Sequence, residues 1–501
     1  MIRQSLGTYS IQDFGASPTK TAAQNDLAIQ AAINAAGAKG GGTIVIPDGT
    51  YQYNEVTITQ PWIKITGSGT LLNGHILVGP GTVPTDLHFE IEKIKLKYDA
   101  IVVGKHGIEL QNARMGQIHN VIFQNCDCGI YVRPIDSMTF QQCQKIEMTN
   151  NHFKEVNYCL YVDRPAYGQA APWQGTPPTD LTVPKQLYQV GDFDFSHNYA
   201  YVAHKAHIYC LGIDGLVCHG NTFFFPGWNL ADQVKTHNIY IDMGNFISIV
   251  GNQLFEAGLE GIKLSHCRNF TIAGNAIPWC GQRDIRSAIL ITGGDQNGQP
   301  FNVGTISANC IEHPRWHGIS IEDSVEGQCG QINISGNTIR DAGNSYGYYG
   351  VALLTSVSHY AVNVTTASQF VAVHGNVAQD DAINVLGDNN VAYDNLTQGR
   401  LIMNTDYALV LAGTETTAAV GKYDRVNLNQ SAPATITTFT GGYDGKTLDI
   451  FGVNGNTTLA YGTGASQFVL KGGPANTTIP ANGYMQFKFL LSHWIEVSRN
   501  F

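Results

Sequence analysis

Two patterns of apolar and polar positions recur through the middle of the chain. Short segments such as 238–242, 261–265 and 318–322 alternate apolar with polar residues, which is the period of a β-strand. About ten residues before many of these segments lies a turn of small residues with an asparagine, and glycine and asparagine tolerate the left-handed backbone best. The repeating unit contains strands and leaves no room for a helix. Each repeat therefore predicts one coil of a stacked solenoid.

The repeats form two ladders whose members recur every ~23 to 48 residues. The predicted turn asparagines are Asn120, Asn151, Asn198, Asn221, Asn252, Asn275, Asn309, Asn337 and Asn376. The predicted inward residues of the strands are Ile130, Leu160, Ile208, Ile239, Ile262, Ile289, Ile319, Val351 and Ile383. Stacked asparagines can hydrogen-bond from coil to coil, so we expect them to be structural. The fold predicted from both ladders is all-β, a right-handed parallel β-helix.

The two ends of the chain differ from the repeats. Residues 1–55 are expected to form an N-terminal segment with a capping helix, because Leu27, Ile29, Ala32, Ile33 and Ala36 give a helical apolar stripe that Gly37 ends. Residues 56–398 are assigned to the β-helix and its groove. The coil between Asn151 and Asn198 is over-long, and its excess, 163–191, is rich in proline and aromatic residues. Residues 399–501 lack the asparagine ladder and read as short strands of an antiparallel β module.

Composition narrows the possible functions. The net charge of −10 argues against a nucleic-acid partner, whose phosphates need a basic surface. No run of 18 apolar residues predicts a membrane span, and the first residues lack the apolar core of a signal peptide. The ten cysteines are scattered through the coils, and Cys126 and Cys128 do not have zinc-ligand spacing, so we expect buried thiols. Neither a metal nor another cofactor is predicted.

The opening segment carries a resemblance to a known group of proteins. The pieces IQDFGA (11–16), AIQAAINAA (28–36) and GGGTIVIPDGTY (40–51) resemble the start of the pectate-lyase-like superfamily, which includes polygalacturonases, rhamnogalacturonases and bacteriophage tailspike depolymerases. The end of the chain, where Trp494 is followed by the sequence EVSRN (496–500), resembles the C-terminal modules of phage tail proteins. Those modules cap the solenoid and hold three chains together. The resemblance implies a parallel β-helix acting on polysaccharide.

Catalytic residues are expected on the outside of the coils, because side chains fill the inside. Enzymes that hydrolyse glycosidic bonds need two carboxyl groups flanking the bond, ~6.5–9.5 Å apart in the inverting type. Glu256, Trp279 and Glu312 follow successive ladder asparagines by three or four residues, so we expect them to stack with the tryptophan between two acids. Glu260 and Asp242 are the alternative acids.

The same region supplies candidate substrate-binding residues. Aromatic side chains can lie against sugar rings, and polar or charged ones can bind hydroxyl and carboxyl groups. A hydrogen-bonding role is preferred for the histidine among them. The predicted set is Trp228, His237, Tyr240, Lys263, Trp279, Arg283, Arg315 and Trp316.

Together with the repeats, the resemblance implies a homotrimeric phage tailspike that binds a capsular or O-antigen polysaccharide of a bacterial surface and hydrolyses it. Such a protein is made in the host cytoplasm and resides in the virion tail, attached through a missing or separate N-terminal part, without membrane insertion. A calcium-dependent lyase would need several acidic residues converging on one turn, and the sequence predicts no such cluster. A polysaccharide lyase on the same fold and a non-catalytic adhesin or structural spike remain the alternatives.

Overall fold

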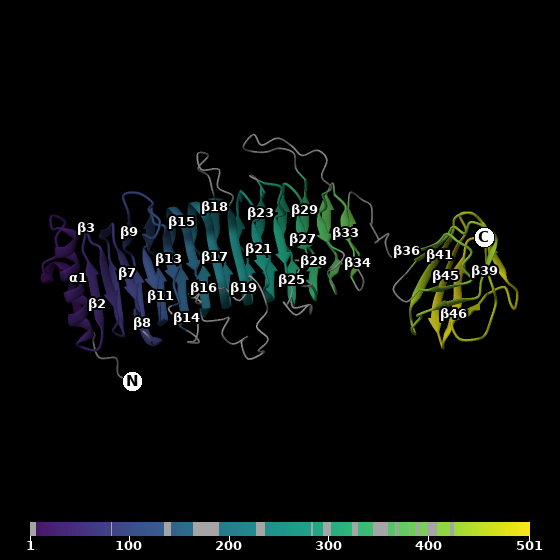
Figure 1. Cartoon of the computed structure of the whole chain (residues 1–501), viewed down its shortest axis with the longest axis horizontal. Helices are drawn as coiled ribbons and strands as arrows, with labels where there is room; N and C mark the ends of the chain where they lie inside the picture. Colours follow the sequence, from purple (N-terminus) through teal and green to yellow (C-terminus); the bar gives the residue numbers. More distant parts are fainter. Residues whose placement is uncertain are drawn as a thin grey trace, which may run out of the picture. The chain divides into compact units, whose positions relative to one another are not determined.

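The computed structural model divides the chain into two compact units, Met1–Ile402 and Met403–Phe501 (Figure 1). The structure describes residues 7–81, 83–134, 142–163, 190–226, 236–281, 284–293, 302–322, 329–343, 359–365, 368, 370–379, 381–386, 390–397, 408–420 and 425–501. Within these ranges, no helix has the length and apolar character needed to cross a bilayer.

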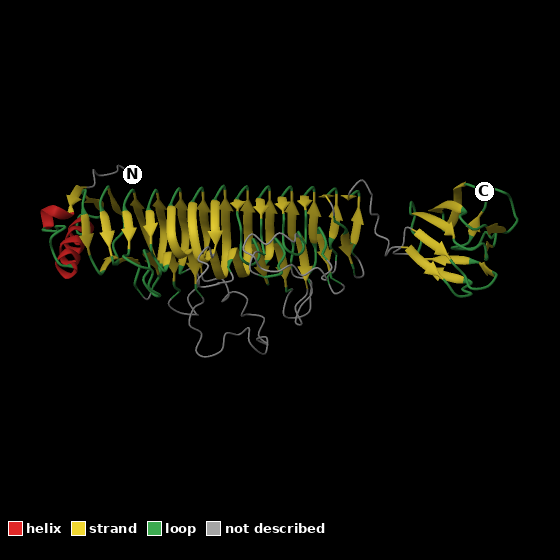
Figure 2. Cartoon of the chain, turned by 90° about the horizontal axis from the view of Figure 1, so that it is seen from above, coloured by secondary structure: helices red, strands yellow, loops and turns green. Residues whose placement is uncertain are grey.

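The first unit begins with a cap. Strand β1 (Gly7–Ser10) and the short 3-10 helix η1 (Ile11–Phe14) lead to helix α1 (Ala22–Gly37), whose start is capped by Thr21 and Gln24. The helix lies at the end of the solenoid (Figure 2) and buries Asn25, Ala28, Ile29, Ala32, Ile33 and Ala36. Leu27 was expected in this stripe but is 74% exposed, because the buried face follows a spacing of three and four residues from Asn25.

The solenoid is a parallel β-helix with three faces, and consecutive strands of each face pair in parallel. Face 1 comprises β2 (Gly42–Ile46), β5 (Ile63–Gly67), β8 (Thr85–Glu92), β11 (Ala113–His119), β14 (Cys143–Thr149), β16 (Val190–Ser196), the ends of β17 (Tyr199–His219) and β19 (His237–Val250), β22 (Arg268–Ala273), β25 (Gly304–Ser307), β28 (Ile332–Ser335), β31 (Ala372–His374) and β34 (Val391–Tyr393). Face 2 comprises β3 (Thr50–Gln52), β6 (Thr70–Leu72), β9 (Lys95–Lys97), β12 (Ile122–Gln124), the starts of β15 (His152–Val162) and β17, β18 (Thr222–Pro226), β20 (Gln253–Leu254), β23 (Ala276–Pro278), β26 (Cys310–Glu312), β29 (Thr338–Arg340), β32 (Val377–Gln379) and β35 (Leu396–Thr397). Face 3 comprises β4 (Glu55–Ile58), β7 (His75–Val78), β10 (Ile108–Leu110), β13 (Cys128–Val132), the end of β15, the middle of β17, the start of β19, β21 (Ile262–Ser265), β24 (Ile289–Thr292), β27 (Ile319–Glu322), β30 (Val362–Val364) and β33 (Ile383–Val385).

The asparagine ladder runs through the turns between faces 1 and 2. Each side-chain oxygen accepts the backbone N–H of the asparagine in the preceding coil, at 2.9 Å for Asn151 to Asn198 and 3.0 Å for Asn376 to Asn395. The prediction that Asn120 is the first member of the ladder was wrong. It is exposed, while the buried Val121 donates its N–H to Asn151 and occupies the ladder position. The ladder also continues to Asn395, which the sequence analysis omitted.

The ladder of inward residues lies in face 3, and the register pairs Ile130 with Leu160 and Ile289 with Ile319. The expected member Val351 falls outside the described residues. Its place is taken by Val362, which pairs with both Ile319 and Ile383. The error arose because the sequence spacing was assumed to stay near 32 residues, whereas this coil is much longer.

The cysteines are free thiols, and nine of the ten are buried. Eight of them lie in the apolar core of the solenoid, as expected. Two do not follow the prediction of thiols stacked inside the coils. Cys310 is exposed on face 2, and Cys128 is buried but lies outside the apolar core.

The second unit is built of small mixed sheets. One contains β36 (Ala408–Leu411), β38 (Arg425–Leu428), β41 (Thr447–Gly452), β43 (Phe468–Val469), β45 (Tyr484–Leu490) and β46 (His493–Arg499); the others contain β37 (Thr417–Ala419) with β40 (Thr438–Thr440), and β39 (Ala434–Ile436) with β42 (Thr457–Leu459) and β44 (Thr477–Ile479). The expected purely antiparallel module was wrong, because β36, β38 and β41 pair in parallel while β41, β45 and β46 pair in antiparallel. Trp494 is fully buried in the core and donates its indole N–H to the Phe439 carbonyl at 2.8 Å.

Candidate functional site

A row of tyrosine rings runs along the outer surface of face 3. The ring centroids of Tyr131 and Tyr161 are 5.6 Å apart, those of Tyr161 and Tyr209 5.5 Å, and those of Tyr209 and Tyr240 4.7 Å. The register places these four residues one above another on successive coils, each directly after an inward ladder residue. The rings therefore form one continuous aromatic surface, which we call the tyrosine row.

The tyrosine row ends beside a cation. Lys263 occupies the next position above Tyr240, and its ammonium group lies 5.6 Å from the Tyr240 ring centroid. A cation over a ring face is attracted by the ring's negative surface. Both residues were predicted to bind substrate, and the structure places them side by side.

A second outward column lies two residues before the inward ladder of face 3. The strand register pairs Cys128 with Tyr158, Tyr158 with Ala206 and Ala206 with His237, and backbone hydrogen bonds continue the alignment through the later coils. The column reads His106, Cys128, Tyr158, Ala206, His237, Glu260, Ser287, His317, Tyr360 and Asp381. It thus brings histidine, carboxyl and hydroxyl groups onto one line beside the tyrosine row.

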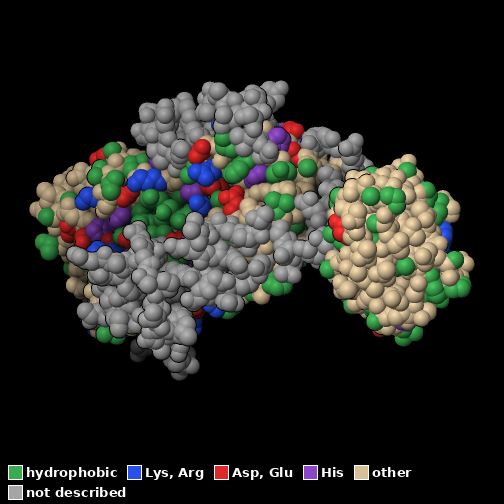
Figure 3. Space-filling view, turned by 45° about the vertical axis from the view of Figure 1, so that its right-hand side comes forward, with side chains coloured by type: hydrophobic (Ala, Val, Ile, Leu, Met, Phe, Trp, Pro, Cys, Tyr) green, Lys and Arg blue, Asp and Glu red, His purple; other side chains and the backbone are tan. Residues whose placement is uncertain are grey.

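The centre of this column is the Glu260 cluster, comprising Thr236, His237, Glu260, Arg286 and Ser287. His237 Nδ1 lies 3.1 Å from Glu260 Oε2, and Arg286 Nε lies 4.0 Å from Glu260 Oε1. The Glu260 side chain is only 1% exposed. Figure 3 shows acidic, basic and histidine side chains gathered on the β-helix surface.

The Glu260 cluster contains buried polar atoms that do not make well-directed hydrogen bonds. Within the described part of the chain, these atoms are Thr236 Oγ1, His237 Nδ1, both carboxyl oxygens of Glu260, Arg286 Nε and Ser287 Oγ. His237 Nδ1 and Glu260 Oε2 nevertheless lie within contact distance of each other. Buried polar groups are normally satisfied, so a cluster of unsatisfied ones indicates a site arranged for a ligand.

Glu260 is held in its ionised form. Burial by itself would raise the pKa of this carboxyl group, but His237 and, at longer range, Lys263 outweigh burial and lower the pKa below its ordinary value. The carboxylate is therefore suited to accept a proton or to stabilise positive charge rather than to donate a proton.

Asp242 lies at the other end of the same face, three residues after Ile239. Its carboxylate is 3.0 Å from His266 Nδ1, and the side chain is 12% exposed. The register aligns Asp242 with Ser265, which in turn aligns with Thr292, and their two hydroxyl oxygens are 3.0 Å apart. This edge of face 3 is therefore also lined with polar groups.

The predicted stack of Glu256, Trp279 and Glu312 was wrong in its third member. The backbone N–H of Trp279 donates to the Glu312 carbonyl, and Glu312 itself aligns with Pro278. The residue level with Trp279 is His313, whose ring centroid is 4.3 Å away. The prediction failed because Glu312 lies three residues after Asn309, whereas Glu256 and Trp279 each lie four residues after their ladder asparagines.

Glu312 instead has a partner on the next coil of face 2. Its carboxylate lies 3.2 Å from Arg340 Nη2, and both side chains are more than one-third exposed. Glu256 is half-buried in the turn that connects β20 to β21, four residues before Glu260. The structure thus brings Glu256 into the turn of the Glu260 cluster and places Glu312 in a surface ion pair.

The remaining predicted residues lie near the column or outside the described residues. The Trp316 ring stacks on His317 at 4.2 Å, and Arg315 donates its backbone N–H to the Cys280 carbonyl. Burial lowers the pKa of Arg315, against which Asp284 acts. Trp228 and Arg283 fall outside the described residues.

Several members of the site were missed by sequence reasoning. They are Tyr131, Tyr158, Tyr161, Tyr209, Thr236, Arg286 and Ser287. Aligning every repeat on its ladder isoleucine would have placed Ser287 level with Glu260 and His237, and would have shown the repeated tyrosine after the ladder residue. Of the positions directly after a ladder residue, the sequence-based prediction included only Tyr240 and Lys263.

No protein-family model and no curated protein matches the chain. Among solved structures, the catalytic unit of a thermostable GH87 α-1,3-glucanase from Streptomyces thermodiastaticus strain HF3-3 is similar with a TM-score of 0.52 and 13% identity, over 79% of this chain and 69% of that one. A DFA-IIIase from Arthrobacter chlorophenolicus A6 in complex with GF2 has a TM-score of 0.47 and 12% identity, over 88% and 95% of the chains. Tailspike protein 3 of bacteriophage CBA120 has a TM-score of 0.43 and 12% identity, over 86% and 66%. At these identities the similarity to the glucanase establishes the β-helix fold alone.

Proposed function

We propose that face 3 binds a polysaccharide and that the Glu260 cluster hydrolyses its glycosidic bonds. The observation that carries the proposal is the position of the cluster. Its unsatisfied buried polar atoms lie at the end of a continuous tyrosine row. Stacked rings provide a flat surface for successive sugars, and a few convergent polar groups orient the bond to be cleaved.

Glu260 is assigned the role of the ionised carboxylate, because its pKa is lowered. A hydrolase also needs a carboxyl group that keeps its proton to protonate the leaving oxygen. Glu256 is assigned this role because it lies in the same turn, and Asp242 is the alternative. His237 and Arg286 hold Glu260 in place, while Tyr240 and Lys263 contact the sugar.

The wider biological proposal follows the resemblance noted in the sequence. We propose that the protein is a homotrimeric phage tailspike whose substrate is a capsular or O-antigen polysaccharide. The similarity of the fold to the catalytic unit of a glucanase is in keeping with action on a polysaccharide.

A lyase is the second candidate, favoured by one observation. Lys263 lies over the ring of Tyr240, which stacks on His237, and Arg286 lies 4.0 Å from Glu260 in the same cluster. A cation can neutralise the carboxylate of a uronic acid while a histidine or tyrosine removes the neighbouring proton.

The deciding experiment is incubation with purified capsules and O-antigens from a panel of bacteria, followed by mass spectrometry. Hydrolysis gives repeat units plus one water, with no new ultraviolet absorbance. Products lighter by one water, with a double bond that absorbs in the ultraviolet, would assign the lyase. Binding without products would assign an adhesin.

A further inference from the structure

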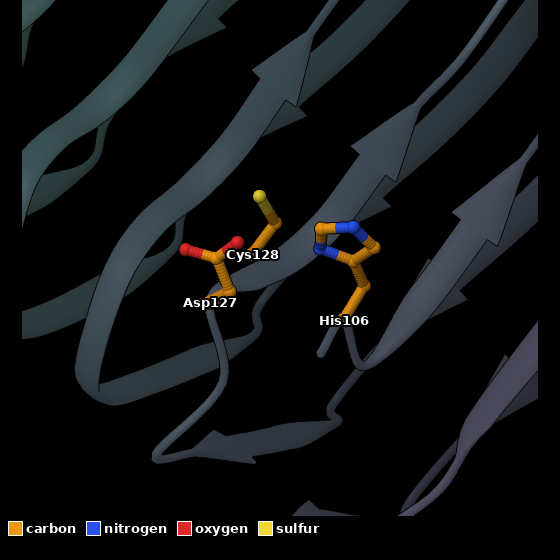
Figure 4. A group of neighbouring side chains, drawn as sticks. All are labelled: His106, Asp127 and Cys128. Carbon is orange, nitrogen blue, oxygen red and sulfur yellow. The ribbon is translucent and has the colours of Figure 1, made fainter. Parts of the chain in front are cut away.

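We propose that His106, Asp127 and Cys128 form a binding site for one zinc ion. Their ligand atoms, one imidazole nitrogen, one carboxylate oxygen and one sulfur, all lie within 4.8 Å of one another. Figure 4 shows the three side chains next to one another, with one ring nitrogen of His106 on the side that faces Asp127 and Cys128. This site is separate from the proposed reaction at Glu260.

The fold brings the three ligands together although His106 is remote in sequence from the other two. Residues 108–110 pair with 130–132, and Gly107 donates its N–H to the Cys128 carbonyl at 2.9 Å, so His106 and Cys128 lie on adjacent coils of face 3. The spacing of Cys126 and Cys128 in the sequence does not predict this site, because the third ligand comes from another coil. Cys126 belongs to the apolar core, whereas Cys128 is 1% exposed but lies outside that core, beside polar groups.

Two hydrogen bonds hold the Asp127 carboxylate in one orientation, as is common for a carboxylate that binds a metal. Its Oδ2 accepts the Gly104 N–H at 2.7 Å, and its Oδ1 accepts the side-chain N–H of Asn157 at 2.7 Å. The residue is 5% exposed, and both of these donors are neutral. Lys205 and Arg133 act on Cys128 and His106 at longer range, and a divalent cation would place a positive charge directly against the buried carboxylate. Hydrogen-bonded carboxylates of this kind also orient metal ligands.

His106 offers an unused nitrogen to the same point. Nδ1 is buried and has no hydrogen-bond partner among the described residues. The ring is held by Tyr131, whose centroid is 4.2 Å away, and the His106 carbonyl accepts the Tyr98 hydroxyl at 2.7 Å. Tyr131 thus packs against the ring, and Tyr98 anchors the backbone of the same residue.

The donor set selects zinc over calcium or magnesium, since it combines sulfur, nitrogen and oxygen. The thiol loses its proton on binding, so a thiolate and a carboxylate balance the two charges of the ion. Three protein ligands leave a fourth tetrahedral position for water or a solvent ligand. Cys128 and Glu260 are four coils apart, or ~19 Å at 4.8 Å per coil, so the ion is not part of the Glu260 cluster.

A second group in the described residues shows how a similar cluster can be satisfied without metal. Glu90, Glu92 and His119 also approach one another, but the Lys64 ammonium lies 2.8 Å from Glu90 and 2.9 Å from Glu92. A protein cation thus already occupies that position. We therefore expect metal binding at His106 and not at His119.

The test is a titration of the reduced, chelator-treated full-length protein with Co²⁺, a spectroscopic substitute for zinc. We expect one Co²⁺ per chain with a thiolate-to-metal absorption band in the near ultraviolet. Cys128→Ser should remove the band, and His106→Ala should weaken binding by at least ~10–100-fold, the loss that even changes around a metal site cause. Cys310→Ser, which changes the exposed cysteine, is the matched control and should leave the spectrum unchanged.

A thermal measurement provides an independent readout. Zinc should raise the unfolding temperature of the wild-type protein and of Cys310→Ser but not that of Cys128→Ser, because an ion that binds only the folded chain stabilises it. Absence of the thiolate band in wild-type protein, or its persistence in Cys128→Ser, would overturn the proposal. Circular dichroism of each variant shows that the fold is retained, and His119→Ala should bind Co²⁺ as wild type does.

Discussion

His237 Nδ1 lies 3.1 Å from Glu260 Oε2, and the two residues sit on adjacent coils at the same position before their ladder isoleucines. This contact joins a half-buried histidine to a carboxylate that is almost fully buried. It lowers the pKa of Glu260 against the effect of burial. A stacked fold therefore brings into contact two polar side chains that belong to different repeats.

Glu260→Gln should reduce turnover of the polysaccharide by ~10²-fold or more, the loss expected for a general acid or base. Glutamine keeps the shape and removes the charge, so binding of the polymer should change little. Turnover is measured from the reducing ends released, or from the product masses.

The matched control is Glu312→Gln, which removes a partly exposed carboxylate paired with Arg340 on face 2. Its turnover should stay near normal. Glu256→Gln and Asp242→Asn then identify the second carboxyl group, since only the proton donor should show a loss comparable to that of Glu260→Gln. A Glu260→Gln protein with wild-type turnover would move the active site away from face 3.

The tyrosine row should carry binding rather than chemistry. Tyr209→Ala should weaken polysaccharide binding by about tenfold or more, or ~1.4 kcal/mol, because its ring contacts Tyr161 and Tyr240 in the middle of the row. Calorimetry with the Glu260→Gln background measures binding without turnover. Tyr209→Phe keeps the ring and should bind normally, and so should Tyr199→Ala on face 2. Equal losses in Tyr199→Ala and Tyr209→Ala would argue against a specific platform.

A buried asparagine of the ladder should contribute far more to the free energy of unfolding than the exposed Asn120 beside the ladder. In Asn275→Ala, the Asn252 N–H loses its acceptor at 2.9 Å, and the Ile249 carbonyl loses a donor at 3.0 Å. Leaving such buried groups unsatisfied costs ~1–3 kcal/mol each. Denaturant unfolding should therefore show a much lower midpoint. Asn120→Gly, at the exposed left-handed position beside the ladder, should be nearly neutral, and equal destabilisation of both variants would contradict the ladder's role.

Lowering the pH should reduce the free energy of unfolding of the solenoid, because the buried His207 resists protonation in the folded chain. Its ring is fully buried against Phe223, with Nδ1 2.9 Å from Asn238 Oδ1, and burial lowers its pKa to about 3. In the unfolded chain the group titrates near its ordinary pKa of 6.5, so the unfolded state binds more protons below that pH. Stability should fall by up to about 1.4 kcal/mol per pH unit from pH 6.5 down to about 3.

The slope is measured by denaturant unfolding across this pH range. His207→Gln should flatten it, whereas His204→Gln, which removes a histidine that pairs with Glu155, should leave the contribution of His207 in place. An unchanged slope in His207→Gln would assign the acid sensitivity to other groups.

The trimer is tested by light scattering. We expect three times the chain mass of 54.3 kDa at micromolar concentration. Deletion of residues 403–501 should give monomeric or aggregated protein if the second unit holds the chains together. A stable trimer after this deletion would place the association in the solenoid, and a monomeric full-length protein would contradict the trimer altogether.

The sequence by itself determined the fold, because each coil repeats the same alternation and the same turn. Most ladder isoleucines and ladder asparagines could be identified from spacing alone, but Asn120 was confused with Val121 by a one-residue offset and Asn395 was omitted. Val362 could not be identified, because a long coil hides the register that stacking imposes. Periodicity fixes which residues point inward as long as the period is kept.

The tertiary structure decided which outward residues meet. Glu260, His237 and Lys263 were candidates from sequence, but only the register of face 3 brings them beside the tyrosine row and Arg286. The same register replaced Glu312 by His313 next to Trp279, and joined His106 to Cys128. In a solenoid, side chains meet across coils whose lengths vary, so a shift of one residue changes every partner. Contacts between coils therefore follow from the backbone pairing and not from the distance along the chain.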